Sequence, residues 1–113
     1  MKMCSAGLIF AALVAAAPAL AQQAKPFGPT TVPCNQADWK NCRVSFDGSN
    51  VTRTYTHPRG GPTTETHAGC SASGGTISCP PGTWRTNSGS ATGRAETLKV
   101  FLDASGRAKG TGH

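Results

Sequence analysis

The chain has few of the residues from which a hydrophobic core is built. Between Gln22 and His113 the aliphatic and phenylalanine residues are only Phe27, Val32, Val44, Phe46, Val51, Ile77, Leu98, Val100, Phe101 and Leu102. This is well below the share of about one fifth at which composition begins to indicate disorder. Charged residues make up only 14% of the chain, which argues against full disorder. A domain so poor in apolar residues buries little surface, so we expect cross-links to contribute much of its stability.

The chain also lacks the motifs of common catalytic and metal sites. It has no G-x-S-x-G nucleophile elbow and no C-x-x-C pair. His57, His67, Cys70 and Cys79 are residue types that bind zinc, but their spacing matches no zinc finger. In an oxidising compartment disulfide formation competes for the same sulfur atoms. We therefore expect neither a metal nor a cofactor.

The N-terminus has the three parts of a secretory signal. Lys2 gives a positive start, residues 6–17 form an uncharged apolar run, and Ala19-Leu20-Ala21 follows Pro18 as a small-x-small cleavage site. A membrane anchor is the alternative, but the run is shorter than the roughly 20 strongly apolar residues that a span needs. We predict a cleavable signal peptide over residues 1–21 and a periplasmic or extracellular protein without a membrane span.

Cleavage changes the cysteine count from odd to even. Cys4 leaves with the signal, whereas Cys34, Cys42, Cys70 and Cys79 remain. An even number of cysteines in an exported domain predicts disulfides, and three pairings are possible. We favour Cys34–Cys42 and Cys70–Cys79 because both loops are short. Chain-entropy arguments give each bond about 2.5 kcal/mol.

Three segments follow the signal. Residues 22–33 contain three prolines and are expected to form an extended leader. Residues 34–109 are expected to form a single small disulfide-stabilised domain, and residues 110–113 a flexible tail. Within the first cysteine loop, residues 37–41 are expected to form one helical turn.

The domain itself is predicted to be mainly β, a small antiparallel sheet or hairpin-rich fold with extensive loops. Residues 42–46 alternate in polarity, residues 51–56 are rich in Thr and β-branched residues, and a turn signal lies between them, so together they predict a hairpin. A third strand is expected within 63–70, and Cys70–Cys79 would clamp a hairpin that ends with residues 76–79. Residues 96–103 are compatible with a strand or a helix, and we favour the strand because a turn signal follows.

One constellation of residues has the chemistry of acid–base catalysis. Tyr55 and His57 are two residues apart and share one face of a strand, as do Glu65 and His67 on the next. If these strands pair, His57, Glu65 and His67 could converge near an arginine, for which Arg53, Arg59 and Arg85 are the candidates. Such a set is what a small ribonuclease-like or glycan-directed hydrolase needs. The alternative is an ordinary polar sheet surface.

Basic residues exceed acidic ones by six over the whole chain, and by about five once Lys2 is removed. The cations are scattered in sequence, at Arg43, Arg53, Arg59, Arg85, Arg94, Arg107 and Lys109. Together with Trp39, Trp84 and Tyr55 they could form a stacking surface for nucleic acid or acidic glycan. We expect an anionic envelope polymer or an unidentified protein as partner rather than nucleic acid.

These features favour a non-enzymatic binding or structural component of the bacterial envelope or extracellular space. A small secreted hydrolase that uses His57, Glu65 and His67 is the first alternative. The second is an inhibitor or toxin-like effector, in which the disulfide-clamped segment 71–78 inserts into a partner. No resemblance to a known family supports one of these over the others.

Overall fold

The computed structural model describes residues 24–113, and this part of the chain is built from β-strands and loops without a helix. The strands are β3 (Phe27–Thr31), β4 (Lys40–Phe46), β5 (Val51–His57), β6 (Gly61–His67), β7 (Ser71–Ser73), β8 (Thr76–Cys79), β9 (Gly82–Thr86), β10 (Thr92–Ala95), β11 (Leu98–Leu102) and β12 (Ala108–Gly112). They form two antiparallel sheets, and the prediction of a mainly β domain is thus confirmed.

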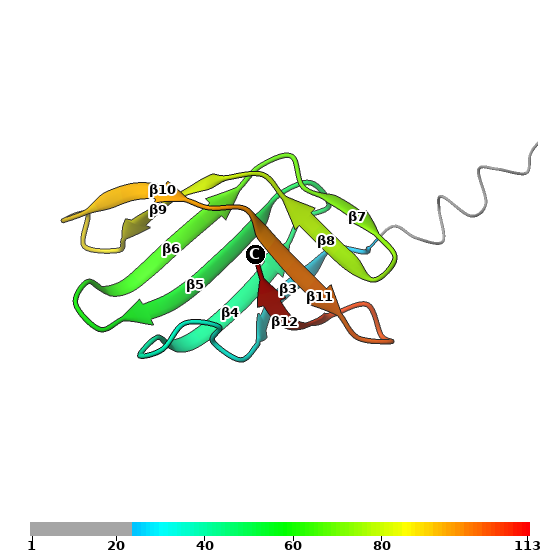
Figure 1. The fold of residues 1–113 in the computed structure, drawn as a ribbon, viewed down its shortest axis with the longest axis horizontal. Coiled ribbons are helices and arrows are strands. Elements are labelled where there is room, and N and C mark those ends of the chain that lie inside the picture. Colours follow the sequence, from blue (N-terminus) through cyan, green and yellow to red (C-terminus); the bar gives the residue numbers. More distant parts are fainter. Residues whose placement is uncertain (1–23) are drawn as a thin grey trace, which may run out of the picture.

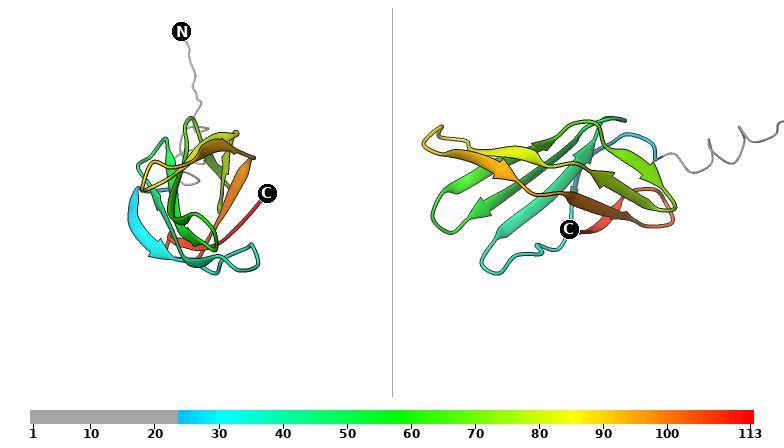
Figure 2. Two further views of the ribbon diagram at one scale, coloured as in Figure 1. Left: turned by 90° about the vertical axis from the view of Figure 1, so that its left-hand side faces the viewer. Right: turned by 45° about the horizontal axis from the view of Figure 1, so that its top comes forward.

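The two sheets differ in size. The larger has six strands in the order β10-β9-β6-β5-β4-β3, and the smaller has four in the order β12-β11-β8-β7. The smaller sheet lies across one half of the larger one and leaves the other half uncovered (Figure 1). Viewed end on, the two sheets curve around a shared interior (Figure 2). We call the side of the larger sheet that faces the smaller one its inner face, and the opposite side its outer face.

The hairpin predicted around residue 48 is confirmed as β4 and β5, which pair from Phe46 opposite Val51. Its turn is held by Asp47, whose Oδ1 accepts hydrogen bonds from the backbone N–H groups of Ser49 (2.8 Å) and Asn50 (2.6 Å). This Asx-type turn reverses the chain locally and sets the register of the two strands.

The hydrophobic core lies between the sheets at the covered half. Val44 and Val51 from the larger sheet and Ile77, Leu98 and Val100 from the smaller one are almost completely buried. Ile77 and Val100 are opposite each other in the β8–β11 register. The few aliphatic residues of the chain are therefore gathered at a single interface.

The segment whose periodicity was ambiguous forms the central strand β11. It pairs with β8 on one side and β12 on the other. Leu98 and Val100 point into the core, while Lys99 and Phe101 are exposed. The strand prediction is confirmed, since only a strand can hydrogen-bond to neighbours on both edges.

Both disulfides have the predicted sequential pairing, Cys34–Cys42 and Cys70–Cys79. The first closes the loop that leads into β4. The second joins the residue before β7 to the last residue of β8, and so clamps that hairpin as expected. Two intramolecular disulfides are typical of proteins that fold in an oxidising compartment.

The expected leader and tail are partly wrong, because both contain paired strands. Phe27–Thr31 forms edge strand β3 against β4, with a register shift between Phe27 and Thr30. Pro29 is tolerated there because an edge strand needs ladder bonds on one side only. At the other end, Gly110–Gly112 continues β12 against β11. Backbone pairing needs no apolar side chains, so a Gly- and Thr-rich sequence gives little indication of it.

The helical turn expected at residues 37–41 is also wrong. Asp38 and Asn41 have φ angles of 72° and 58°, in the left-handed region. A right-handed turn requires negative φ, whereas Asp and Asn tolerate the left-handed conformation better than most residues. Lys40 already belongs to β4.

The predicted signal peptide, residues 1–21, lies outside the residues that the structure describes, so it stays a prediction. Within residues 24–113 no helix could span a membrane.

Candidate functional site

Four successive residue pairs of β5 and β6 face the inner side of the sheet. The antiparallel register places Val51 opposite His67, Arg53 opposite Glu65, Tyr55 opposite Thr63, and His57 opposite Gly61. Successive pairs are about 7 Å apart along the strands. The series begins under the smaller sheet and ends at the uncovered half. Hydrophobic, charged, aromatic and imidazole groups thus follow one another along one face.

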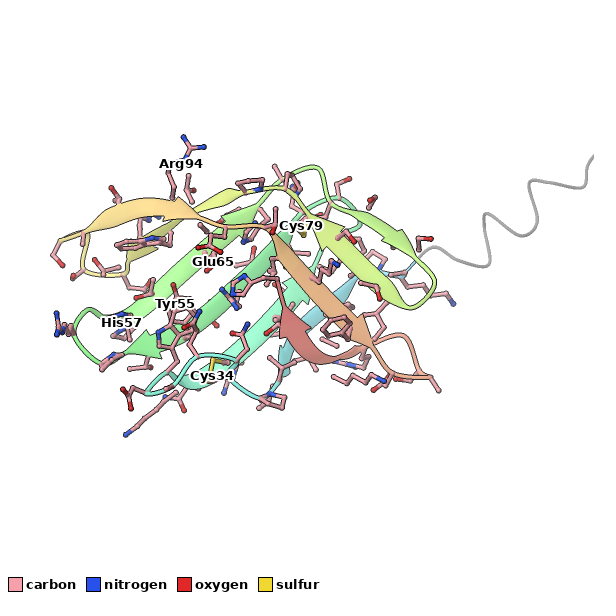
Figure 3. All side chains as sticks on the ribbon, in the orientation of Figure 1. Cys34, Tyr55, His57, Glu65, Cys79 and Arg94 are labelled. Atoms are coloured by element: carbon pink, nitrogen blue, oxygen red, sulfur yellow. A yellow bond between two sulfur atoms is a disulfide. The ribbon has the colours of Figure 1, made fainter. Side chains whose placement is uncertain are left out.

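The uncovered half contains a pocket of about 530 Å³. Its lining includes Trp39, Arg53, Tyr55, Glu65, Trp84 and Thr86. Glu65 and Trp84 are register partners across β6 and β9, as are Thr63 and Thr86, so these side chains share the inner face with Arg53 and Tyr55. Pockets of this size and aromatic lining are typical of small-molecule sites. Figure 3 shows Tyr55 and Glu65 on this part of the sheet.

Aromatic rings form two walls of the pocket. Trp39 and Tyr55 are stacked with their ring centroids 3.7 Å apart and their planes 3° from parallel. Trp84 lies against Gly93 of β10, where a Cβ would come within 2.6 Å of the indole ring. Gly93 is therefore needed for the ring to lie close to the sheet. Both tryptophans of the chain belong to this pocket.

The floor of the pocket is a buried network of charges. Arg53 Nη2 donates to both carboxylate oxygens of Glu65, at 2.8 and 3.0 Å. Glu65 Oε2 also lies 2.5 Å from His67 Nε2. Arg53, Glu65 and His67 are all at least 97% buried. Arg53 Nε has no hydrogen-bond partner among the described residues, so the guanidinium is not fully satisfied.

The hydrogen bonds of His67 indicate that its ring is doubly protonated. Nδ1 lies 2.8 Å from the carbonyl oxygen of Pro80, which can only accept, so Nδ1 must carry a proton. Nε2 faces the Glu65 carboxylate, which Arg53 stabilises in its ionised form. His67 is then an imidazolium, and Arg53, Glu65 and His67 together carry one net positive charge.

The pKa shifts agree with this assignment. Burial alone would raise the pKa of Glu65, but the hydrogen bond from His67 and the charge of Arg53 outweigh it and lower the pKa below 4.5. Burial alone would lower the pKa of His67, but its hydrogen bonds to Glu65 and Pro80 raise it above 6.5. Burial and the negative charge of Glu65 raise the pKa of Tyr55 to about 12. The phenol is therefore neutral in any physiological medium.

The loop closed by Cys34–Cys42 supplies the wall opposite Trp84. Asn35 Oδ1 accepts a hydrogen bond from Arg53 Nη1 (3.2 Å), and Gln36 and Trp39 line the pocket. The Arg53 guanidinium carbon lies 5.1 Å from the Trp39 ring centroid, within the range of a cation–π contact. This disulfide therefore holds part of the site in place, whereas neither cysteine of Cys70–Cys79 lines the pocket.

The three candidate catalytic residues share one face, but they do not converge. Glu65 and His67 bind each other and are buried. His57 lies two pairs further along the strand from Glu65, about 13 Å by strand geometry. His57 Nδ1 accepts hydrogen bonds from the backbone N–H groups of Arg59 (3.0 Å) and Gly60 (3.3 Å). The described residues thus place no free acid–base pair in the pocket.

The arginines considered beside these residues have different locations. Arg53 is in the floor, Arg59 is at the rim, and Arg85 is on the outer face, opposite Thr64. Sequence reasoning assigned no role to Asn35, and it placed Trp39, Trp84 and Tyr55 on a binding surface without placing them in one pocket. The spacing of Arg53, Tyr55 and His57 could have indicated the pocket, because residues two apart on a strand share one face.

Within residues 24–113, no three His, Cys, Asp or Glu side chains gather as metal ligands. Glu65 and His67 do lie in contact, but the third member of their network is Arg53, whose guanidinium repels a metal ion.

No protein-family model matches the chain, and neither a curated protein nor a solved structure has significant similarity to it.

Proposed function

We propose that this chain is an exported binding protein that holds a small acidic ring compound in the pocket of the uncovered half. The observation that carries the proposal is the position of both tryptophans and the buried charge network around one pocket, in a domain with very few apolar residues. Trp39, which packs at the edge of the hydrophobic core, and Trp84 both line this cavity.

The aromatic walls favour a ligand with a flat apolar face. Trp84 and the Trp39–Tyr55 stack offer ring surfaces on which an aromatic or sugar ring can pack. Exposed polar groups of the lining, among them Gln36 and Ser90, can hydrogen-bond to ring hydroxyls. A sugar ring has both an apolar C–H face and a polar edge, so it suits this lining best.

The charge network favours an acidic substituent on that ring. A buried ion pair costs desolvation that apolar residues would avoid, so its retention indicates a role beyond stability. Its net charge of one positive unit, in a partly desolvated pocket, attracts a carboxylate and repels an ammonium group. The proposed ligand class is therefore a sugar acid.

Neither alternative function is favoured by a specific observation. The hydrolase would need Glu65 or His67 to exchange protons with a substrate, yet both are buried and bonded to each other. The effector would use segment 71–78, which forms the short hairpin β7–β8 with Ile77 buried in the core.

Intrinsic tryptophan fluorescence tests the proposal directly, because both fluorophores lie in the pocket. The probes are glucuronate, glucose and glucosamine, which share a ring and differ in charge. We expect a saturable change whose affinity falls in that order. No saturable change with any of the three, or tightest binding of glucosamine, would contradict the proposal.

A matched pair of variants locates the binding. Trp84→Ala removes a pocket wall and should abolish the response of the remaining tryptophan to glucuronate. Phe101→Ala removes an exposed aromatic ring from the smaller sheet and should leave it unchanged. Equal effects of the two substitutions would place the ligand elsewhere.

A further inference from the structure

The outer face of the six-stranded sheet is a second surface, on the side opposite the pocket. Two rows of side chains cross it from strand to strand. One row is Ser45, Thr52, Thr66, Thr83 and Arg94, and the other is Arg43, Thr54, Thr64, Arg85 and Thr92. Residues that are directly opposite in the register point to the same side. The rows therefore form one continuous field of hydroxyl groups and guanidinium groups.

The cations of this field are exposed and unneutralised. Arg43, Arg85 and Arg94 are all exposed, and within residues 24–113 none of them forms an ion pair. The Arg94 side chain projects away from the ribbon (Figure 3), while the residue itself also borders the pocket. Arg85 and Arg94 are diagonal neighbours on β9 and β10, at a Cβ distance of about 7–8 Å. Like charges this close repel each other when no anion is bound.

All five acidic residues of the chain lie away from the outer face. Glu65 is on the inner face and Glu96 is at the pocket. Asp47 and Asp103 sit in turns, where their carboxylates accept backbone hydrogen bonds, and Asp38 is in the first disulfide loop. The separation of charge is therefore a property of the fold that the scattered sequence positions did not reveal.

We propose that this outer face, with the hydroxyl rows between Arg43 on one side and Arg85 and Arg94 on the other, docks the protein on a linear acidic polysaccharide. The arginines pair with carboxylates of the polymer, and the threonine hydroxyl groups between them hydrogen-bond to its sugar hydroxyls. Arg43 and Arg85 are separated by three strand spacings, about 14 Å, so an extended chain is needed to reach both.

A polysaccharide fits this face better than a nucleic acid does. Surfaces for single-stranded nucleic acid combine cations with aromatic rings on which bases stack. The two rows contain no aromatic residue, and Trp39, Tyr55 and Trp84 are all at the pocket on the inner face. This docking does not depend on the ligand of the pocket, so the two proposals can fail separately.

The experiment measures binding of the full exported chain to polygalacturonate by co-sedimentation over a range of salt concentrations. We expect binding that weakens steeply with salt, as counterions are released from the polymer, and no binding to neutral dextran. The double variant Arg43→Gln, Arg85→Gln, which leaves the pocket lining intact, should lose at least about tenfold in affinity and give a shallower salt dependence. It should still bind glucuronate in the pocket.

The matched control removes the same charge from other surfaces. Lys99→Gln, Lys109→Gln also replaces two exposed cations and should retain most of the affinity. A loss equal to that of the arginine variant would show that net charge alone is responsible and would overturn the proposal. Tighter binding of a single-stranded oligonucleotide than of polygalacturonate would overturn it as well.

A second variant guards against a folding defect in the double one. Thr66 is exposed in the middle of its row, so Thr66→Glu adds a carboxylate to the field without removing a core contact. This variant should weaken polymer binding while circular dichroism and thermal unfolding stay unchanged. Unaltered polymer binding would contradict the assignment of this face.

Discussion

The covered and uncovered halves of the larger sheet are made from the same strands but do different things. Under the smaller sheet, Val44 and Val51 belong to one hydrophobic cluster with Ile77, Leu98 and Val100. Beyond its edge, the same strands carry a buried ion network and a pocket. The change takes place within two residues of β5, from Val51 to Arg53.

This contrast indicates how a chain with few apolar residues distributes them between a core and a pocket. The buried aliphatic side chains lie between the two sheets. Their burial contributes about 25 cal/mol to the free energy of unfolding for each Å² of apolar surface. The other half is held by hydrogen bonds, ring stacking and a disulfide-closed loop. Such a half is less stable by itself but can accept a ligand, and binding would then add to its stability.

The largest expected effect comes from breaking the charge network that separates the halves. Glu65→Gln removes the anion that neutralises Arg53 and His67, and so leaves two buried cations side by side. We expect a loss of about 3–5 kcal/mol in the free energy of unfolding, the usual result of removing one partner from a buried ion pair. Urea denaturation measures it, and a loss below 1 kcal/mol would show that the network is not buried in solution.

The two disulfides sharpen the contrast, because Cys34–Cys42 closes a loop that lines the pocket, whereas Cys70–Cys79 clamps the β7–β8 hairpin of the smaller sheet. Each disulfide is removed by a double variant, Cys34→Ala with Cys42→Ala or Cys70→Ala with Cys79→Ala. Each double variant should lower the free energy of unfolding by about 2.5 kcal/mol. Only the first should also weaken glucuronate binding, since its loop carries Asn35 and Trp39. Equal effects of both pairs on binding would mean that the pocket depends on global stability alone.

The pH dependence of stability should follow from the network as well. The pKa of His67 is raised above 6.5, so its contribution is complete below that pH and is lost as the pH rises through the folded-state pKa. The pKa of Glu65 is lowered below 4.5, so its contribution is complete above that pH and is lost on acidification. Stability from this network should therefore be greatest between pH 4.5 and 6.5.

Thermal unfolding from pH 4 to pH 9 measures this profile. His57 takes no part in the network, so His57→Gln should keep the decline on the alkaline side. A wild-type stability that rises steadily from pH 6 to pH 9 would contradict the protonated assignment of His67.

The smallest expected effect on stability is at the pocket wall. Gly93→Ala places a Cβ within 2.6 Å of the Trp84 ring and must displace it. The ring is only half-buried, so we expect a cost of about 1 kcal/mol in the free energy of unfolding. Glucuronate affinity should fall by more than tenfold. A fall in stability without a change in glucuronate affinity would show that Trp84 does not contact the ligand.

Much of the fold could be predicted from the sequence because its signals are local. The alternation in residues 42–56, the Asp47 turn and the short cysteine loops identified the first hairpin and both disulfides. The strands at Phe27–Thr31 and Gly110–Gly112 were missed because their pairing depends on backbone groups and on partners far along the chain. The two positive φ angles in the first disulfide loop leave no pattern of polarity either.

The site was predicted only in part, for a similar reason. Periodicity put Glu65 and His67 on one face, and pairing with β5 brought Arg53 to them. The end of the smaller sheet decides which part of that face is open, and no local pattern encodes this. Trp84 joins the pocket through the β6–β9 register, a contact between strands that are not neighbours in the chain.

The most direct test of the division between the halves is an NMR titration of the protein with glucuronate, monitored by ¹H–¹⁵N spectra. The account predicts that the two indole N–H signals of Trp39 and Trp84 and the amide signals of Thr63 and Thr86 shift. The amide signals of Ile77, Leu98 and Val100 should stay in place. Shifts confined to the covered half, with both indole signals unmoved, would contradict it.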